Sequence, residues 1–104
     1  MYVLRNTNKK SKYFGQLCVS PNKYCGSVYV RYANNKSIYT NVNNFAIVHE
    51  IRKGEVVKVG DKTWKINDFG YDTIYLTDGR PFSFKSITTW FYLKNCFRFG
   101  AKLE

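Results

Sequence analysis

The sequence predicts an all-β protein with little helix, built either as two small antiparallel β units in tandem or as one merged antiparallel barrel. Short segments of alternating apolar and polar residues are separated by turn-forming residues, and one hairpin-like pattern occurs twice within 104 residues. Long amphipathic patterns with a helical period are absent from the sequence. The β-branched and aromatic residues of 86–95 disfavour a helix longer than a turn or two.

The repeated strand, turn and strand pattern is found first in 28-VYVRYANNKSIYTNV-42 and then, 44 positions later, in 72-DTIYLTDGRPFSFKS-86. Identical residues are few, but residues of the same class fall at matching positions. Asn34-Asn35 and Asp78-Gly79 stand where each hairpin would turn. Both dipeptides tolerate the positive φ angles of two-residue hairpin turns. The repeat therefore predicts two β-hairpins of similar design.

Alternation also assigns the side chains of each hairpin to two faces. Val28, Val30 and Tyr32 share one face of the first hairpin, which we expect to be buried. The opposite faces present polar and aromatic residues, either as a binding surface or as ordinary cross-strand packing. These outer residues are Tyr29, Arg31, Tyr39 and Asn41 in the first hairpin, and Thr73, Tyr75, Ser83 and Lys85 in the second.

Further apolar segments before and after each hairpin are also typical of strands. They are residues 2–4, 17–19 and 45–48 in the first half, and residues 55–59, 64–66 and 90–93 in the second. Each half then holds about five short strands, which divides the chain into a first, strongly basic unit at 1–50 and a second unit at 51–104. A chain of this length needs its bulky aromatic residues in the core. We assign to it Trp64, Trp90, Phe82, Phe84, Phe91, Phe97 and Phe99.

The glycine-led segment 54-GEVVKVG-60, the segment from Gly70 to Phe84 and the matching segment from Gly26 to Thr40 resemble SH3-like small barrels of the KOW and Tudor type. The resemblance covers most of the chain and implies two such barrels in tandem. Barrels of this kind bind nucleic acid, modified protein tails or proline-rich peptides, so the surface must select the function. More loosely, the chain is similar to phage-encoded DNA-binding proteins of the MotB type, which implies a modulator of host or viral transcription.

Charge is distributed unevenly along the chain. The sequence has 17 Lys and Arg against seven Asp and Glu, a formal net charge of +10, yet residues 1–49 contain no acidic residue. A half without carboxylates cannot neutralise its own field, so we expect it to attract a polyanion. The alternative is a positive surface that serves only solubility.

Residues 5–12, RNTNKKSK, form a polar arm in which cations alternate with hydrogen-bonding side chains. Lys and Arg neutralise phosphates and release counterions, while Asn, Ser and Thr donate to phosphate oxygens. Tyrosines beside cations can stack on exposed bases or pack on the sugars of a duplex. A solvated loop without a partner is the alternative for the arm. The predicted nucleic-acid contacts are Arg5, Lys9, Lys10, Lys12, Lys23, Tyr29, Arg31, Lys36, Tyr39, Arg80 and Lys85.

The function that these features predict is sequence-independent binding of double-stranded DNA through phosphate contacts. Two linked basic units would spread contacts along a duplex, and no long helix is predicted that could enter a major groove. Duplex DNA is therefore favoured over RNA. The alternatives are an RNA-binding module acting on transcripts or ribosomes, and a protein-interaction module that inhibits an acidic host protein.

Neither catalysis nor a cofactor is expected. His49 and Glu50 are adjacent on a predicted strand and would point to opposite faces. The three cysteines are read as reduced thiols, and their spacing with His49 matches no familiar zinc motif. Neither a secretion signal nor an apolar run of roughly 20 residues is recognisable in the sequence. We therefore expect a cytoplasmic protein without a membrane partner, in the host cytoplasm if the gene belongs to a phage.

Overall fold

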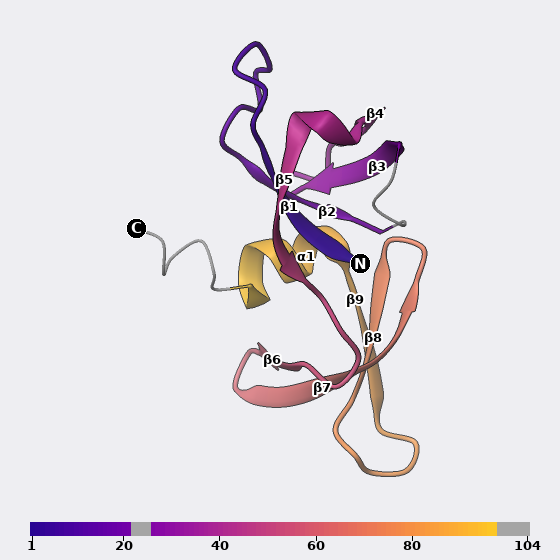
Figure 1. The fold of residues 1–104 in the computed structure, drawn as a ribbon. Helices are drawn as coiled ribbons and strands as arrows, with labels where there is room; N and C mark the ends of the chain where they lie inside the picture. The colour runs from indigo at the N-terminus through magenta and orange to yellow at the C-terminus, as the bar shows by residue number, and fades with distance from the viewer. Residues whose placement is uncertain (22–25, 98–104) are drawn as a thin grey trace.

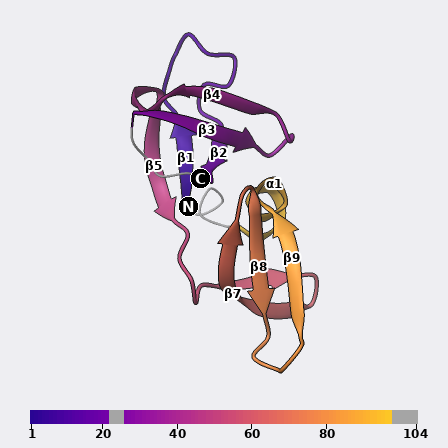
Figure 2. The same cartoon turned by 90° about the vertical axis from the view of Figure 1, so that its right-hand side faces the viewer.

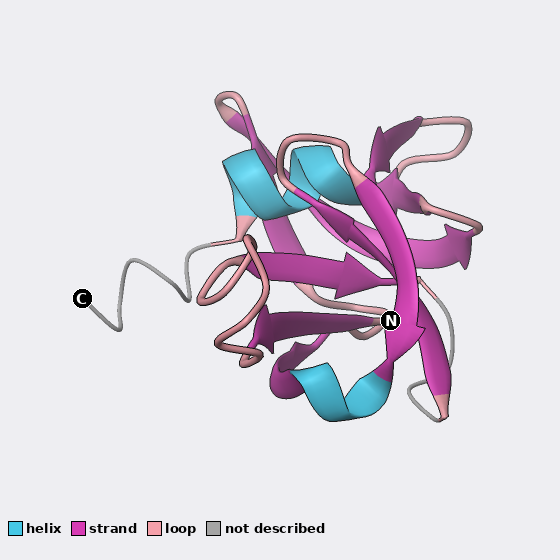
Figure 3. Ribbon diagram, turned by 90° about the horizontal axis from the view of Figure 1, so that it is seen from above, coloured by secondary structure: helices cyan, strands magenta, loops and turns pink. Residues whose placement is uncertain are grey.

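A computed structural model describes residues 1–21 and 26–97 and consists mainly of two antiparallel β-sheets, so the predicted all-β class is confirmed (Figures 1 and 3). The strand order is β4-β3-β2-β1-β5 in the first sheet and β6-β7-β8-β9 in the second. The strands of the first sheet are β1 (Tyr2–Asn6), β2 (Leu17–Ser20), β3 (Ser27–Tyr32), β4 (Ser37–Asn41) and β5 (Phe45–Glu50). Those of the second are β6 (Val56–Val59), β7 (Lys62–Gly70), β8 (Thr73–Thr77) and β9 (Phe84–Thr88).

The first sheet follows the predicted alternation. Val28, Val30 and Tyr32 on β3 are buried, while Tyr29 and Arg31 between them are half-buried on the other face. β1 lies next to edge strand β5 and pairs with both β2 and β5. A short 3₁₀ turn, η1 (Val42–Asn44), connects β4 to β5. All five strands predicted for this half are present.

The two predicted hairpin turns are longer than two residues. In the first, the Asn35 amide donates to the Tyr32 carbonyl over 2.9 Å, and Asn35 takes a φ of 68°. This is the geometry of a three-residue loop that ends in a left-handed residue, rather than a two-residue turn. In the second, β8 ends at Thr77 and β9 begins at Phe84, which leaves six residues in the loop. The turn-forming dipeptides marked the right places but not the loop lengths.

The strand predicted at 90–93 is wrong, because the chain is helical there. The Thr88 hydroxyl accepts a hydrogen bond from the Phe91 amide and caps α1 (Thr89–Phe91), which continues into a π-helical turn, η2 (Tyr92–Cys96). Thr89, Tyr92 and Leu93 are buried. Their spacing is that of a helix face, so the apolar side of this segment has a helical and not an extended period.

A shared core joins the two halves. It includes Val3 and Val19 from the first sheet, Ile66 and Ile74 from the second, and Tyr92 from the helical segment. In Figures 1 and 2 this segment lies between the two sheets, and α1 contacts β2 and β3. A second cluster of buried residues lies within the first half. All its members come from strands of the first sheet: Leu4, Cys18, Val28, Val30, Tyr32 and Phe45.

The predicted core aromatics divide into correct and incorrect assignments. Trp64 is buried, and Phe91 and Phe97 pack against the core while partly exposed. Phe82 and Phe84 are wrongly assigned, with exposed fractions of 97% and 64%. Phe82 lies in the six-residue β8–β9 loop, and Phe84 is the exposed first residue of β9. Trp90 is half-buried, and Phe99 lies outside the described residues.

Polar contacts also connect the sheets. Arg31 on β3 forms an ion pair with Asp72, in the turn between β7 and β8. Asp72 in turn accepts a hydrogen bond from the Thr89 hydroxyl at the start of α1. Beside this pair, the rings of Tyr29 and Tyr71 are in contact, with centroids 5.8 Å apart.

No helix in residues 1–21 and 26–97 has the length and apolar character needed to cross a membrane.

Candidate nucleic-acid interface

The β1–β2 loop, residues 7–16, has a backbone held in place by hydrogen bonds. Buried Asn6 receives the Asn8 amide on its side-chain oxygen at 2.9 Å and the Gly15 amide on its carbonyl at 2.8 Å. The Thr7 amide donates to the carbonyl of Asn44, in η1, at 2.8 Å. In Figures 1 and 2 the loop projects from the end of the first sheet that is remote from the second sheet. The predicted arm is therefore a structured loop.

The three lysines of this loop, Lys9, Lys10 and Lys12, are all exposed. The Lys10 amide donates to the Asn8 side-chain oxygen at 3.0 Å, which fixes the turn that presents the lysines. The Lys12 ammonium lies 5.3 Å from the centroid of the Tyr13 ring. The Tyr13 ring stacks on that of buried Tyr32 at 4.3 Å. The loop thus displays exposed cationic side chains on a backbone that is hydrogen-bonded to buried Asn6 and to Asn44.

The other predicted contacts of the first unit are spread around the same sheet. Arg5 is half-buried on β1, and Lys36 is exposed at the β3–β4 turn. Tyr39 on edge strand β4 is 71% exposed. Lys23 lies outside the described residues. Tyr39 is thus accessible for stacking.

Tyr29 and Arg31 lie where the two sheets meet. Besides its ion pair with Asp72, Arg31 donates to the Tyr29 hydroxyl at 3.1 Å and to the Asn35 side-chain oxygen at 2.8 Å. The Arg31 side chain is only 17% exposed. These contacts give both residues a structural role between the sheets.

In the second unit, the predicted contact Arg80 is bound to an acid. Its guanidinium donates to Asp78 at 2.8 Å, and Lys62 donates to the same carboxylate oxygen at 2.7 Å. The hydrogen bonds from Arg80 and then Lys62 hold the pKa of Asp78 well below its usual range. Lys85, on β9, is exposed.

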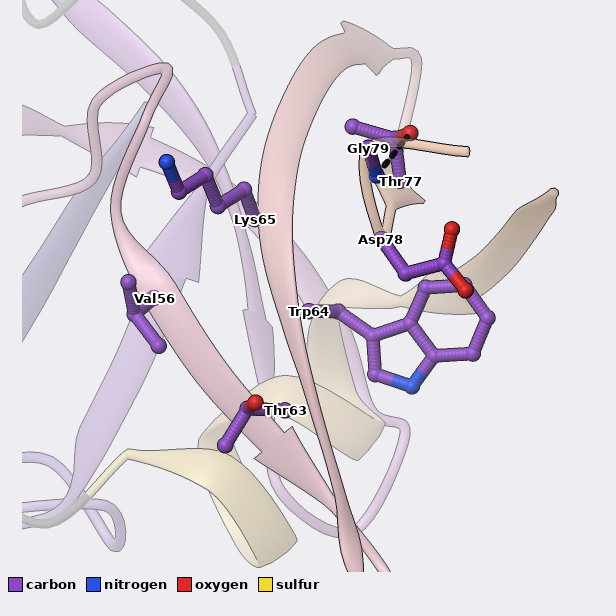
Figure 4. Close-up of a pocket in the computed structure, with 7 residues that line it drawn as sticks. All are labelled: Val56, Thr63, Trp64, Lys65, Thr77, Asp78 and Gly79. Atoms are coloured by element: carbon purple, nitrogen blue, oxygen red, sulfur yellow. Dashed lines mark hydrogen bonds between the residues drawn. The ribbon is translucent and has the colours of Figure 1, made fainter. Parts of the chain in front are cut away.

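Asp78 also borders a pocket of about 220 Å³ between β6, β7 and the start of the β8–β9 loop (Figure 4). Figure 4 shows the indole of Trp64 beside the Asp78 carboxylate, with the Gly79 amide hydrogen-bonded to the Thr77 hydroxyl. The Lys62 ammonium lies 4.2 Å from the centroid of the Trp64 ring. A carboxylate ionised at neutral pH makes this pocket a poor site for phosphate.

Several acidic residues are neutralised by ion pairs with cations of the second half. Glu50 pairs with Arg52, Asp68 with Lys53, and Asp78 with Lys62 and Arg80. By contrast, five cations of the first unit make no ion pair within the described part of the chain. They are Arg5, Lys9, Lys10, Lys12 and Lys36. Four described lysines of the second half also make no ion pair there: Lys58, Lys65, Lys85 and Lys94. That half, however, contains six of the seven acidic residues, so the loop and the β3–β4 turn are the regions whose positive charge no acid of the same half balances.

One polar cluster was missed by sequence reasoning, which considered His49 only beside its neighbour Glu50 and expected the two side chains to point to opposite faces. The structure instead places His49 Nε2 2.6 Å from Glu55 Oε1, while the Tyr92 hydroxyl donates to Glu55 Oε2 at 2.6 Å. Burial, and then the bond to Glu55, raises the pKa of Tyr92. The cluster connects the end of β5 and the segment between β5 and β6 to the helical segment. Spacing in the sequence gave no sign of it, because Tyr92 is distant along the chain.

Among the described residues, no three His, Cys, Asp or Glu side chains form a group suited to a metal ion.

Comparison of the chain with protein-family models, curated proteins and solved structures finds no match.

Proposed function

We propose that the protein binds nucleic acid, preferably double-stranded DNA, through phosphate contacts made by the β1–β2 loop and the β3–β4 turn. The observation that carries this proposal is the set of cations without an acidic partner on the first sheet, beside a second sheet whose acids are largely paired. Exposed lysines without partners have free ammonium donors for phosphate oxygens. Their binding releases counterions condensed on DNA.

The shape of the protein supports contacts that do not depend on sequence. The described helical segment is short and packed between the sheets, so among the described residues no long helix is free to enter a major groove. The longest dimension of the molecule is 47 Å. At 3.4 Å per base step, a duplex lying along it would span about 14 base pairs. Loops carrying Lys, Asn and Ser read phosphates and leave the bases unread.

A relationship to SH3-like barrels of the KOW or Tudor type belongs to the same proposal. It is supported by a first half with five short antiparallel strands, in which β1 pairs with both β2 and β5. A cytoplasmic role as a phage-encoded modulator of host or viral transcription is the biological form of this function that we propose.

The test is a salt titration of labelled duplex DNA binding by fluorescence anisotropy, with wild type and a Lys9→Ala, Lys10→Ala, Lys12→Ala variant. If the five cations without partners each neutralise one phosphate, the slope of log K against log salt is about −4.5. The triple variant then loses affinity on every duplex sequence, and its slope falls to about −2.

The matched control replaces three exposed lysines of the second half, Lys58, Lys65 and Lys94, by alanine. It removes the same charge and is expected to keep most of the slope. Equal losses in the two triple variants would mean that net charge alone drives binding. Absence of duplex binding near 100 mM salt would refute the proposed function.

One observation favours RNA or another single strand as a second candidate partner. Tyr39 is 71% exposed on edge strand β4, where its ring is available for stacking on an unpaired base. Removal of such a platform in Tyr39→Ala is expected to weaken single-strand binding by about 1 to 3 kcal/mol and to leave duplex binding unchanged. An acidic host protein is a third candidate, and competition between that protein and duplex DNA separates the two partner classes.

A further inference from the structure

A small polar pocket lies beside the β1–β2 loop, whose residues Asn8 and Ser11 help to line it. Its volume is about 90 Å³, well below the roughly 300 Å³ at which pockets for drug-sized ligands begin. Only a compact group fits it. The lining comes from the end of β1, the β1–β2 loop, β3, β4, η1 and the first residue of β5. The residues are Asn6, Asn8, Ser11, Tyr32, Ile38, Thr40, Asn44 and Phe45.

Buried Asn6 organises the pocket. It is 4% exposed, and its side-chain nitrogen donates to the Tyr32 hydroxyl at 3.0 Å and to the Ser11 hydroxyl at 3.3 Å. Its side-chain oxygen accepts the Asn8 amide. Both ends of the Asn6 amide are therefore used in holding the walls together. The pocket is fixed before any ligand arrives, which lowers the entropic cost of binding.

Other lining groups keep protons available for donation. Ser11 Oγ accepts from Asn6 and from the Tyr13 amide, and Thr40 Oγ1 accepts from Asn44 Nδ2 at 3.0 Å, so each hydroxyl can still donate its own proton. Asn8 uses its side-chain oxygen to accept the Lys10 amide. Within residues 1–21 and 26–97, its side-chain nitrogen has no protein acceptor. The mouth of the pocket thus offers several neutral donors.

The pocket also lacks negative charge. Residues 1–49 contain no acid. Burial raises the pKa of Tyr32, which lines the pocket, to about 12 and that of its neighbour Cys18 to about 12, so the phenol and the thiol stay neutral at physiological pH. Lys9 and Lys10 stand between two of the lining residues, Asn8 and Ser11. The pocket bordered by Asp78 in Figure 4 has the opposite character.

We propose that this pocket binds one phosphate group, and that in the DNA complex the group is a phosphodiester of the duplex backbone. The assignment of the ligand to DNA rests on the proposed function. Neutral donors from Asn8, Ser11 and Thr40 would hold the phosphate oxygens, and the lysines of the loop would balance the charge. The pocket would then fix the position of the backbone on the loop, while the lysines supply most of the attraction.

The first experiment records amide NMR spectra of the folded protein during titration with inorganic phosphate and, separately, with dimethyl phosphate, a diester. Chloride at matched ionic strength is the control. Shifts confined to the backbone amides of the pocket, with dimethyl phosphate as well as with phosphate, are the expected result. A response to inorganic phosphate alone would overturn the assignment to a DNA backbone. Shifts no different from those in chloride would overturn the site itself.

The second experiment measures duplex DNA binding by two pocket variants. Thr40→Val removes one hydroxyl without changing side-chain shape, and we expect it to weaken binding about three- to tenfold with an unchanged salt slope. Asn44→Asp places a carboxylate in the wall, and we expect about a tenfold or greater loss together with loss of the phosphate response. The matched control is Asn67→Asp on exposed β7, which makes the same charge change elsewhere.

These outcomes separate the pocket from the proposed function. If wild type binds duplex DNA while both pocket variants behave like Asn67→Asp, the pocket proposal is wrong and the proposed function stands. If the pocket responds to phosphate and dimethyl phosphate while duplex DNA is not bound, the proposed function fails and the phosphate site stands without its DNA role.

Discussion

The ion pair between Arg31 and Asp72 joins the two sheets, and the structure allows the cost of breaking it to be worked out. Each side chain is 17% exposed, so both charges are largely withdrawn from water. Arg31 keeps three other acceptors, the Tyr29 hydroxyl and both the side-chain oxygen and the backbone carbonyl of Asn35. Asp72 also accepts from Thr89 at the start of α1. The pair therefore couples β3, the β7–β8 turn and the helical segment.

Asp72→Asn removes the charge while keeping the shape of the side chain. Asp72 has a φ of 62°, a left-handed conformation that asparagine also tolerates, so no backbone strain is added. Leaving one partner of a buried pair uncompensated costs about 3 to 5 kcal/mol. The remaining acceptors of Arg31 and its residual exposure reduce this to about 2 kcal/mol. For a domain of this size that corresponds to a fall in Tm of roughly 8 to 16 °C.

The assay is thermal unfolding followed both by far-UV circular dichroism and by tryptophan fluorescence. Trp64 and Trp90 both lie in the second half, whereas circular dichroism reports both sheets. Because the shared core contains residues of both, the two signals are expected to change together. The control, Asp68→Asn, breaks an exposed pair with Lys53 and is expected to leave Tm close to that of wild type. An Asp72→Asn shift no larger than this control would refute the reasoning.

Three further predictions concern single side chains. Phe82 is 97% exposed with a φ of 60°, so Phe82→Gly is expected to raise the free energy of unfolding by about 1 kcal/mol in urea titrations, and a decrease would contradict the strain argument. The raised pKa of Tyr92 means that the folded state holds this proton more tightly than the unfolded state. Stability should therefore fall as pH rises above about 10, and Tyr92→Phe should flatten that decline, whereas identical pH profiles would argue against it. Burial raises the pKa of Cys18 from 9.0 to about 12, so its contribution to stability is lost as pH rises through that range. In a variant whose other cysteines are serine, the Cys18 thiol should react with a disulfide reagent only as fast as the protein unfolds, and faster labelling would show that the site opens locally.

Local patterns in the sequence predicted most of the strands. The alternation of Val28, Val30 and Tyr32 can be read from neighbouring residues alone. It predicted the buried face correctly because these three side chains all point into the core. The strand predicted at 90–93 was wrong because aromatic and β-branched residues favour extended backbone in general. The packing of this segment depends instead on the helical spacing of buried Thr89 and Tyr92. The predicted two-residue length of the hairpin loops was also wrong. A turn-forming dipeptide sets where the chain reverses, but not how many residues join it in the loop.

The candidate site divides in the same way. The exposure of Lys9, Lys10 and Lys12 followed from their polar surroundings in the sequence. The contact between Arg31 and Asp72 joins residues 41 positions apart, so no local pattern contained it. The pocket that we propose binds phosphate likewise needs the loop, β4 and η1 to be brought together. Its one sequence signal was the mixture of amide and hydroxyl side chains with cations in residues 5–12.

The contacts between the sheets also bear on why the chain has two units. Two linked basic surfaces would gain affinity by engaging one polyanion together. In the structure, however, Arg31 of the first sheet is neutralised by Asp72 of the second, and the β8–β9 loop at the far end of the molecule carries Asp78. The unpaired lysines of the second half lie among its acidic residues, whereas those around the β1–β2 loop and the β3–β4 turn belong to a half whose residues 1–49 contain no acid. If the protein binds DNA as proposed, we infer that the second unit mainly holds the first sheet in place and so orients its positive field toward the duplex.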